Sequence, residues 1–225
     1  GPLYSAESDA GQRVVVPFLR HLGLSRIDLM MVTHRDTDHS GGAASVLSAL
    51  RVDKVSSSLA DSLGEPCVAG QRWTWDGVAF EVLHPAAEAY AGNAKPNHLS
   101  CVLRIVAGGR RMLLTSDIEA PDEAALLQRY AGDLAADIML VPHHGSKTSS
   151  TPDFIKAVGA SEVIVPVGYR NRFGHPKPEV LARYEAQGSR LWRTDRDGAV
   201  RIELGGAMPS PAAWRQEHHR YWQGR

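Results

Sequence analysis

The sequence predicts an α/β fold, and three observations support that prediction. Short apolar runs typical of buried strands recur along the chain, and stretches with a helical period follow them. Polar loops join the two kinds of element, and three of them place His or Asp directly after a strand, at 34–39, 117 and 143–144. A fourth, at 171–175, adds Asn and His. Because sites in α/β proteins form at the carboxyl ends of strands, we expect one pocket fed by several strand ends.

The first quarter of the chain is predicted to begin with an exposed loop over 1–11, because these residues are small and polar. The apolar period of 13–22 indicates a helix that ends at Gly23. The continuous apolar run just before the His/Asp loop predicts a strand buried on both faces. The elements expected around that loop are a strand over 28–33, a helix over 42–50 and a strand over 52–59.

Two hairpins are predicted in the middle of the chain. Residues 72–83 alternate on both sides of Asp76-Gly77, and a second alternating pair turns at Gly108-Gly109. Polar loops precede each hairpin. The ranges expected are 60–71 for the first loop, 84–98 for the second loop, and 100–106 with 110–114 for the arms of the second hairpin.

The remainder continues the alternation of helix and strand. Helices are expected over 121–130, 151–158 and 178–187, and strands over 138–141 and 162–167. A terminal hairpin of 190–194 with 199–204 is predicted to turn at Asp197-Gly198. We divide the chain into a domain over 1–205 and a basic, aromatic tail over 206–225.

Composition limits the function classes. The chain has 225 residues, 43% of them hydrophobic, which is enough to form a core that does not need disulfides or metal ions for stability. Its formal net charge is zero, so nothing global attracts it to nucleic acid or to an anionic membrane. No apolar run approaches about 18 residues and no signal-peptide pattern occurs, so we expect a soluble chain. Cys67 and Cys101 can form one bridge or stay as two buried thiols, and we favour the thiols.

The polar loop Thr33-His34-Arg35-Asp36-Thr37-Asp38-His39-Ser40-Gly41-Gly42 is the strongest candidate for a site. It holds two imidazoles and two carboxylates within six residues. Neutral imidazole with carboxylate is a ligand set for divalent metals, and four such groups suit two ions better than one. A plain helix cap would need only one of them. The loop therefore predicts a metal centre.

With these residues in hand, the chain resembles the metallo-β-lactamase superfamily, and within it the C-terminal β-lactamase-like domain of ComEC-type competence DNA-uptake proteins. The matching segments are THRDTDHSGG at 33–42, NHLS at 97–100, LLTSD at 113–117, VPHHGSKTSS at 141–150 and GHPKPEV at 174–180. They span most of the chain in the family's order. The resemblance implies a four-layer αβ/βα sandwich with a dinuclear metal site at one edge of its two sheets.

The resemblance also implies the ligands of that site. One ion is expected on His34 and Asp36 and the other on Asp38 and His39, with Asp117 between them. The late histidine motif supplies His143 or His144, and the sequence leaves open which imidazole binds. Two departures from the family pattern matter. Asp36 stands where a second histidine is usual, and Asn97 and Ser100 stand where another ligand histidine is usual, with His98 beside them; we favour a plain loop histidine there.

Both departures make the ligand set richer in oxygen. The resemblance therefore implies two divalent ions, with Mn²⁺ favoured and Zn²⁺ or Mg²⁺ as alternatives. The superfamily also begins with paired strands that end in an Asp-x-Gly segment, and no such strands are expected before residue 12. We therefore expect the fold to lack its N-terminal strands here. The sheet edge exposed in this way can pair with another chain.

The implied chemistry is hydrolysis of a phosphodiester. Asp38 and Asp117 are expected to anchor the ions and orient the nucleophile, and His175 to protonate the leaving oxygen or hold a phosphate. The residues expected to contact substrate are Asn97, Ser146, Lys147, Asn171 and His175. The alternative for the His175-Pro176 segment is simple closure of a loop.

Basic residues offer partial support for DNA as a partner. The cations that could line a DNA path are Arg110, Arg111, Lys147, Arg170, Arg172 and Lys177. A solvated face is the alternative, and the one we favour. In the tail, arginines interleave with Trp214, Tyr221 and Trp222, which suits single-stranded nucleic acid. There too we favour the alternative, a C-terminal helix that docks its aromatic residues on the domain.

The family implies a metal-dependent DNA nuclease that degrades the strand not transported during natural transformation. The alternatives are a non-catalytic domain that guides DNA, and a hydrolase of small esters or lactams on the same fold. The expected partners are DNA, with single strands favoured, and the membrane-embedded channel part of the chain's own full-length protein. The family further implies a domain of an inner-membrane protein that faces the periplasm or the extracellular side; the sequence leaves the oligomeric state open.

Overall fold

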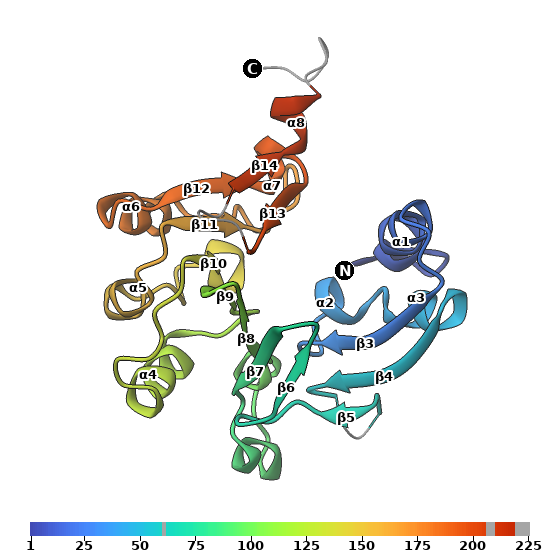
Figure 1. Cartoon of the computed structure of the whole chain (residues 1–225), viewed down its shortest axis with the longest axis horizontal. Helices are drawn as coiled ribbons and strands as arrows, with labels where there is room; N and C mark the ends of the chain where they lie inside the picture. Colours follow the sequence, from blue (N-terminus) through green and yellow to red (C-terminus); the bar gives the residue numbers. More distant parts are fainter. Residues whose placement is uncertain (60–61, 206–209, 219–225) are drawn as a thin grey trace. The chain divides into compact units, whose positions relative to one another are not determined.

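Parallel strand pairing organises the chain in the computed structural model, which describes residues 1–59, 62–205 and 210–218 (Figure 1). The contacts divide the chain into two units. The first consists of Gly1–Gln71 and His84–Cys101, and the second of Arg72–Leu83 and Val102–Arg225. Each unit contains a sheet whose strands deliver polar loops at their carboxyl ends. The predicted α/β class is confirmed.

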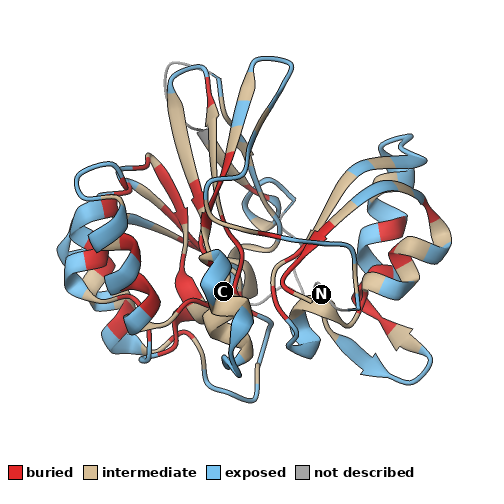
Figure 2. Ribbon diagram, turned by 90° about the horizontal axis from the view of Figure 1, so that it is seen from below, coloured by how far each residue is buried: buried red, intermediate tan, exposed pale blue. Residues whose placement is uncertain are grey.

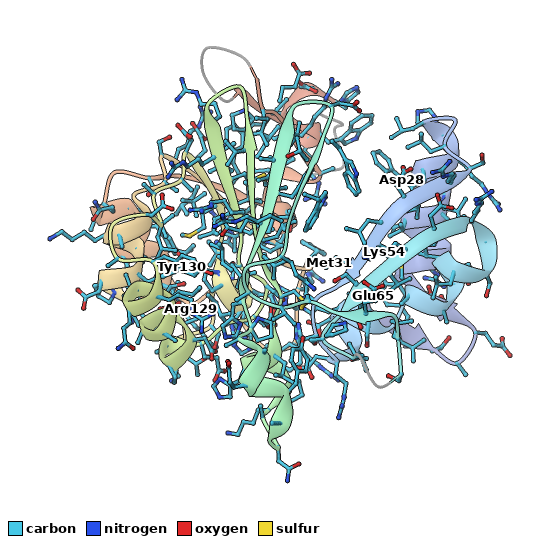
Figure 3. All side chains as sticks on the ribbon, turned by 60° about the horizontal axis from the view of Figure 1, so that its bottom comes forward. Asp28, Met31, Lys54, Glu65, Arg129 and Tyr130 are labelled. Carbon is cyan, nitrogen blue, oxygen red and sulfur yellow. A yellow bond between two sulfur atoms is a disulfide. The ribbon has the colours of Figure 1, made fainter. Side chains whose placement is uncertain are left out.

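The first unit is built on a three-stranded parallel sheet. Its strands are β3 (Arg26–Val32), β4 (Arg51–Ser57) and β5 (Glu65–Pro66). An ion pair of 2.7 Å joins Lys54 to Glu65 across β4 and β5, both labelled in Figure 3. The helical segments of this unit are η1 (Gly11–Val15), α1 (Val16–His21) and α3 (Ala43–Ala49). They bury Val16, Val46 and Leu50 against the sheet.

Two expectations about the start of the chain are wrong. Residues 1–11 are not all loop, because β1 (Leu3–Ser5) pairs antiparallel with β2 (Ser8–Asp9). Asp9 is buried and accepts hydrogen bonds from the backbone of Gln12, at 2.9 Å, and from the hydroxyl of Ser45, which ties the segment to η1 and α3. In β3 only Val32 is buried, not the whole strand, since the helices of this unit pack on the sheet through one core cluster. Among the described residues β3 pairs with a strand only on its β4 side.

The favoured interpretation of the cysteines is also wrong, because Cys67 and Cys101 form a disulfide. The backbone explains their meeting. Cys67 donates its N–H to Ser57 at the end of β4, and Cys101 donates to Thr33 at the end of β3. These two strand ends are neighbours in the sheet, since Val32 pairs with Ser57. The disulfide therefore ties Cys101, which closely follows Asn97 and His98, to the residues after β5, and the backbone N–H of Cys101 ties it to the start of the His/Asp loop.

The second unit is built on a seven-stranded sheet in the order β12-β11-β10-β9-β8-β7-β6. The strands β6 (Arg72–Trp75) with β7 (Val78–His84), and β8 (Val102–Ala107) with β9 (Arg110–Leu114), are the two predicted hairpins. The strands β10 (Ile138–Leu140), β11 (Glu162–Val165) and β12 (Arg190–Arg193) continue in parallel from β9. Their carboxyl ends therefore lie at one edge of the sheet.

Helices cover one face of this sheet. They are α4 (Ala120–Arg129), α5 (Pro152–Val158) and α6 (Pro178–Ala186), all within one or two residues of prediction. Figure 2 shows their inward faces as buried, and the largest side chains there are Phe154 and Tyr184. At the end of α4, the Tyr130 hydroxyl donates to the carbonyl of Leu83 at 3.1 Å (Figure 3). A second, smaller core on the other face contains Ile138, Ile164 and Trp192.

The predicted terminal hairpin is wrong. The strand β12 pairs in parallel with β11, and Thr194–Asp197 forms a helical turn, α7. The partner of β13 (Val200–Glu203) is β14 (Ser210–Ala213), which lies in the segment assigned to the tail. Ala213 is buried in the smaller core, so this part of the segment belongs to the fold.

Short helices occupy several predicted loops and part of the predicted tail. They are α2 (Thr37–Ser40), η2 (Ala87–Ala91), η3 (Pro96–Leu99), η4 (Pro142–Gly145) and α8 (Trp214–Glu217). Within the described part of the chain, no helix combines the length and apolarity that crossing a membrane requires.

Candidate metal and phosphodiester site

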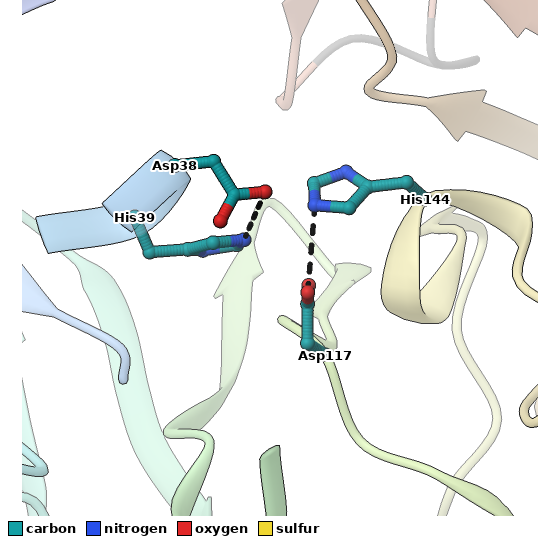
Figure 4. Close-up of side chains that lie close together, drawn as sticks. All are labelled: Asp38, His39, Asp117 and His144. Atoms are coloured by element: carbon teal, nitrogen blue, oxygen red, sulfur yellow. Dashed lines mark ion pairs between the residues drawn. The ribbon is translucent and has the colours of Figure 1, made fainter. Parts of the chain in front are cut away.

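The loop after β3 gathers the first set of predicted ligands within the first unit. His34 is fully buried, whereas Asp36 and Asp38 keep about half of their side-chain surface exposed, at 48% and 46%. The Nε2 atom of His34 lies 3.8 Å from Asp36, and that of His39 lies 3.9 Å from Asp38. Figure 4 draws the second of these pairs. Each imidazole of this loop thus has one carboxylate within 4 Å of its Nε2 atom.

The two imidazoles of this loop are held by one residue that the sequence interpretation missed. The hydroxyl of Thr33 lies 3.4 Å from Nδ1 of His34 and 3.2 Å from Nδ1 of His39. The two rings lie 4.0 Å apart between centroids. A ring that donates its Nδ1–H to this hydroxyl keeps its lone pair on Nε2, which is then the nitrogen that can bind a metal. The sequence feature that could have identified Thr33 is its position directly before His34.

The segment in which the family usually has another ligand histidine also lies in the first unit. Asn97 and His98 are half-buried on η3, and Ser100 is fully buried behind them. His84, another residue missed by the motif analysis, donates its Nδ1–H to the carbonyl of Ser100 at 2.9 Å. The predicted substrate contact of Asn97 stays a prediction.

The second set of predicted ligands lies in the second unit, after β9 and β10. Asp117 is 3% exposed, and its Oδ2 lies 3.4 Å from Nε2 of His144 (Figure 4). His143 places its Nε2 4.0 Å from the same oxygen. The backbone N–H of His143 donates to the carbonyl of Ser116 at 3.1 Å, which joins the two strand ends directly.

The two histidines differ in how their rings are held. His144 donates its Nδ1–H to the carbonyl of Pro166 at 2.6 Å, which assigns the lone pair to Nε2 on the side of Asp117. His143 instead turns Nδ1 toward the Thr148 hydroxyl, at 3.2 Å, and the Glu119 carboxylate, at 3.3 Å. The ring of His144 is therefore oriented as a metal-binding imidazole is. Glu119 was missed, although it stands only two residues after Asp117.

His175 belongs to the same cluster. Its ring lies 6.0 Å from that of His143, between centroids. Its Nδ1 is fully buried and has no hydrogen-bond partner among the described residues. Burial, followed by the charges of His143 and Lys177, lowers the pKa of the His175 ring, so the ring is neutral near pH 7.

The other predicted contacts of this unit are placed as follows. Ser146 is buried, with its hydroxyl 3.0 Å from that of Thr148, and Lys147 is exposed beside it. The side chain of Asn171 bonds both the N–H and the carbonyl of His175, at 2.9 and 2.6 Å, so it shapes the loop. Contact of these residues with substrate stays a prediction.

The predicted DNA-lining cations fall into two groups. Arg110 pairs with Asp137 at 2.8 Å, and Arg111 pairs with Asp133 at 2.9 Å, so both serve the sheet. Arg170 and Arg172 have no ion pair within the described part of the chain, and they lie on the loop after β11.

The start of the predicted tail contacts the domain through Arg215, which donates a hydrogen bond to the carbonyl of Asp195 at 2.7 Å. The aromatic side chain of Trp214 is exposed instead. Tyr221 and Trp222 lie outside the described residues.

The donor chemistry of both sets fits a divalent metal. Each contains carboxylate oxygens beside an imidazole whose second nitrogen is already bonded to the protein. The buried, unpartnered Nδ1 of His175 adds a polar atom that needs a partner when the site is filled.

Comparison with known proteins decides the family. Residues 2–169 match the family described as the metallo-beta-lactamase superfamily. The chain belongs to the metallo-β-lactamase superfamily. Its metallo-β-lactamase fold is shared with CmlA, a diiron β-hydroxylase from Streptomyces venezuelae, at a TM-score of 0.51 and 12% identity over 84% of this chain and 45% of that one.

Relatives in the superfamily include proteins named for competence. Competence protein ComA of Neisseria gonorrhoeae is 38% identical over 196 residues, which are 87% of this chain and 28% of that protein. ComE operon protein 3 of Bacillus subtilis (strain 168) is 30% identical over 84% of this chain and 26% of its own length. The resemblance to ComEC-type proteins is confirmed. The chain spans only about a quarter of these relatives.

Proposed function

We propose that this metallo-β-lactamase-fold chain is a metal-dependent phosphodiesterase that cleaves DNA, and that it degrades the strand not transported during natural transformation. The observation that carries the proposal is the pair of Asp117 and His144. A buried carboxylate faces an imidazole whose ring is fixed by the Pro166 carbonyl, as a ligand pair requires. Similarity to proteins named for competence supports DNA as the substrate.

The proposed metal site takes ligands from both sets. His34 with Asp36 would hold one ion, Asp38 with His39 would hold the other, and Asp117 would contribute its carboxylate to both. His144 is the preferred late histidine, because its Nδ1 is bonded to a carbonyl. The oxygen-rich set favours two Mn²⁺ ions over Zn²⁺ or Mg²⁺. When bound, such a pair of ions supplies Lewis acidity to the phosphate and to the attacking water.

The protein's own groups have separate tasks in this proposal. Asp38 and Asp117 orient the water for in-line attack on phosphorus. His175 either donates an N–H to a phosphate oxygen or protonates the leaving oxygen, and its lowered pKa favours the first role because the ring is neutral. Ser146 and Lys147 add contacts to phosphate, and Asn171 fixes the backbone of His175.

The proposed setting is the non-cytoplasmic side of an inner membrane, with the membrane-embedded part of the same full-length protein as partner. The disulfide between Cys67 and Cys101 supports this side, because such bonds persist in oxidising compartments. Delivery of single-stranded DNA by the channel part would bring substrate to the site.

One experiment tests the proposed activity. The purified chain is incubated with end-labelled single- and double-stranded DNA in Mn²⁺, in Zn²⁺ and in chelator. We expect cleavage in Mn²⁺, none in chelator, and none with Asp38→Ala or Asp117→Ala. Asp28→Ala is the matched control, because this carboxylate is exposed near the other end of β3.

The alternative functions give different results in the same experiment. Hydrolysis of a chromogenic ester or lactam without DNA cleavage would replace the nuclease by a small-substrate hydrolase. Tight DNA binding without turnover in any metal would favour a domain that only guides DNA, as the substituted ligands Asp36 and Asn97 allow.

A further inference from the structure

The loop between β11 and α6 carries an arrangement that the proposed chemistry does not use. Tyr169 and Phe173 are among the most exposed large apolar side chains described, at 68% and 60%. Each has an arginine beside it in the sequence, Arg170 and Arg172. A single exposed aromatic residue is ordinary, but two that alternate with cations on one loop are a repeated pattern.

The arginines of this loop lie over the rings. The guanidinium carbon of Arg170 lies 5.2 Å from the centre of the Tyr169 ring, and that of Arg172 lies 4.9 Å from the centre of the Phe173 ring. Neither arginine has a carboxylate partner among the residues that the structure describes. Both charges therefore remain available to an anion. A planar guanidinium on an aromatic face also extends the flat surface on which a base can stack.

The loop is held in shape by its own hydrogen bonds. Asn171 binds the backbone of His175 at both ends of its amide, and Lys177 donates to the carbonyl of Phe173 at 3.0 Å. Arg170 adopts a positive φ of 52°, which the surrounding bonds maintain. A loop ordered in advance loses less conformational entropy when it binds a flexible ligand.

The loop leads directly to the histidine cluster of the second unit. Phe173 stacks on His175 with centroids 6.0 Å apart and an interplanar angle of 16°, and His175 neighbours His143. The N–H of Lys177 donates to the carbonyl of Gly145 at 2.9 Å, which fixes the end of the loop to the His143-His144-Gly145 turn. A strand stacked on Phe173 would therefore have its adjoining phosphate beside His175.

We propose that Tyr169, Arg170, Arg172 and Phe173 form a platform for single-stranded nucleic acid, in which the rings stack on bases and the arginines contact phosphates. The inference rests on the proposed function, and it names the form of substrate that the site accepts. A duplex hides the faces of its bases, so only an unpaired strand can use the rings. Every base has a flat face that can stack, so we expect the platform to distinguish single strands from duplexes without preferring particular bases.

The test measures binding in chelator, where cleavage cannot interfere. Fluorescence anisotropy compares an oligo-dT with an abasic oligonucleotide of the same length and charge. We expect the chain to prefer oligo-dT by about tenfold per stacked base. Phe173→Leu and Tyr169→Leu each lose about tenfold for oligo-dT and nothing for the abasic strand, whereas Phe173→Trp and Tyr169→Phe retain the preference.

The arginines are tested by salt dependence. For single strands the slope of log affinity against log salt is about −0.7 per phosphate contact, so Arg170→Gln and Arg172→Gln should each make it shallower by about 0.7. Trp75→Ala is the control for an exposed aromatic residue away from the loop, because Trp75 lies on β6, an edge strand that four strands separate from β11. Unchanged thermal unfolding of each loop variant verifies that it is folded.

The outcomes separate this inference from the proposed function. A preference for oligo-dT that depends on the loop, with no cleavage in any metal, would keep the platform and reject the nuclease. Cleavage with equal binding of both oligonucleotides, or equal losses in Trp75→Ala, would reject the platform and leave the nuclease standing. Loop-dependent binding to vesicles with anionic lipid, without binding to oligo-dT, would reassign the loop to a membrane surface and overturn the proposal.

Discussion

Ser116, His143 and His144 adopt positive φ values of 50°, 48° and 54° at the ends of β9 and β10. Residues other than glycine pay about 1–3 kcal/mol each for such conformations, which persist only where the surroundings hold them. Here the backbone N–H of His143 donates a hydrogen bond to the carbonyl of Ser116, and the ring of His144 donates one to the carbonyl of Pro166. In these conformations Nε2 of His143 and Nε2 of His144 lie 4.0 and 3.4 Å from Oδ2 of Asp117, and such strain is concentrated in functional sites.

The difference between the two histidines leads to a prediction at this scale. His144→Ala should weaken Mn²⁺ binding about 100-fold, because it removes the imidazole whose lone pair faces Asp117. His143→Ala should weaken it about tenfold or less, because its ring is turned toward Glu119 and Thr148. Isothermal titration calorimetry measures both. The reverse order would assign the ligand to His143.

Gly145 provides a second prediction. Its φ is 81°, and a Cβ atom there would lie 2.6 Å from the side chain of Pro176. Gly145→Ala should therefore destabilise the fold by about 2 kcal/mol and displace His175. Gly168→Ala is the control, since a Cβ at that position meets nothing within 4 Å. Urea unfolding should separate the two variants, and equal stabilities would refute the packing argument.

At the scale of elements, a charged bridge joins three strands of the large sheet. Glu81 on β7 accepts hydrogen bonds from Arg72 on β6, at 2.6 Å, and from Arg104 on β8. Arg104 also binds Asp133 beyond α4, at 3.0 Å. Burial raises the pKa of Glu81, but the hydrogen bonds from Arg72 and Arg104 outweigh it, and the pKa is lowered overall.

The sign of this pKa shift fixes its effect on stability. Because the folded-state pKa of Glu81 lies below the unfolded value of about 4.3, the carboxylate stabilises the fold above that pH. The contribution is lost as the pH falls through the folded-state pKa. Glu81→Gln should cost about 3 kcal/mol at pH 7, since it leaves Arg104 buried without this partner, and the cost should shrink in acid. Urea unfolding at pH 7 and pH 3 measures both, and a cost independent of pH would contradict the assignment.

At the scale of elements, sequence periodicity was sufficient to predict the hairpins and helices of the large sheet. Both predicted hairpins and the three helices on the large sheet were confirmed, because alternation and capping residues such as Thr151 are local signals. The partner of β12 was not predictable in this way. Its sequence pattern suits an antiparallel hairpin and a parallel edge strand equally, and packing of Trp192 against Ile138 and Ile164 selects the parallel neighbour.

At the scale of the whole molecule, the disulfide and the neutral net charge bear on function. The disulfide joins two cysteines 34 residues apart, and it holds Cys101, whose N–H donates to the carbonyl of Thr33, beside the end of β4. The 25 Lys and Arg residues are balanced by 25 Asp and Glu residues, so the chain as a whole does not attract DNA. Attraction must come from local groups, such as Arg170 and Arg172 of the Tyr169–Phe173 loop, which have no carboxylate partner among the described residues.

Loss of the disulfide is the prediction at this scale. Cys67→Ala with Cys101→Ala should destabilise the chain by about 3–4 kcal/mol, as expected for a loop of this length. Thermal unfolding with and without dithiothreitol is the measurement. The reductant should lower the Tm of the native chain to that of the variant and leave the variant unchanged. Equal Tm values in all four samples would show that the bond does not contribute.

The sequence by itself determined the α/β class, most elements, the superfamily and the residues proposed as ligands, because period, turn residues and ligand types are properties of short segments. The tertiary structure decided that Cys67 meets Cys101, that His144 and not His143 is anchored by Pro166, and that β12 joins β11. It also stacked Phe173 on His175, in a loop whose backbone is held by hydrogen bonds from Asn171 and Lys177. These features depend on which strand ends are neighbours, and neighbours are chosen by packing between residues far apart in the chain.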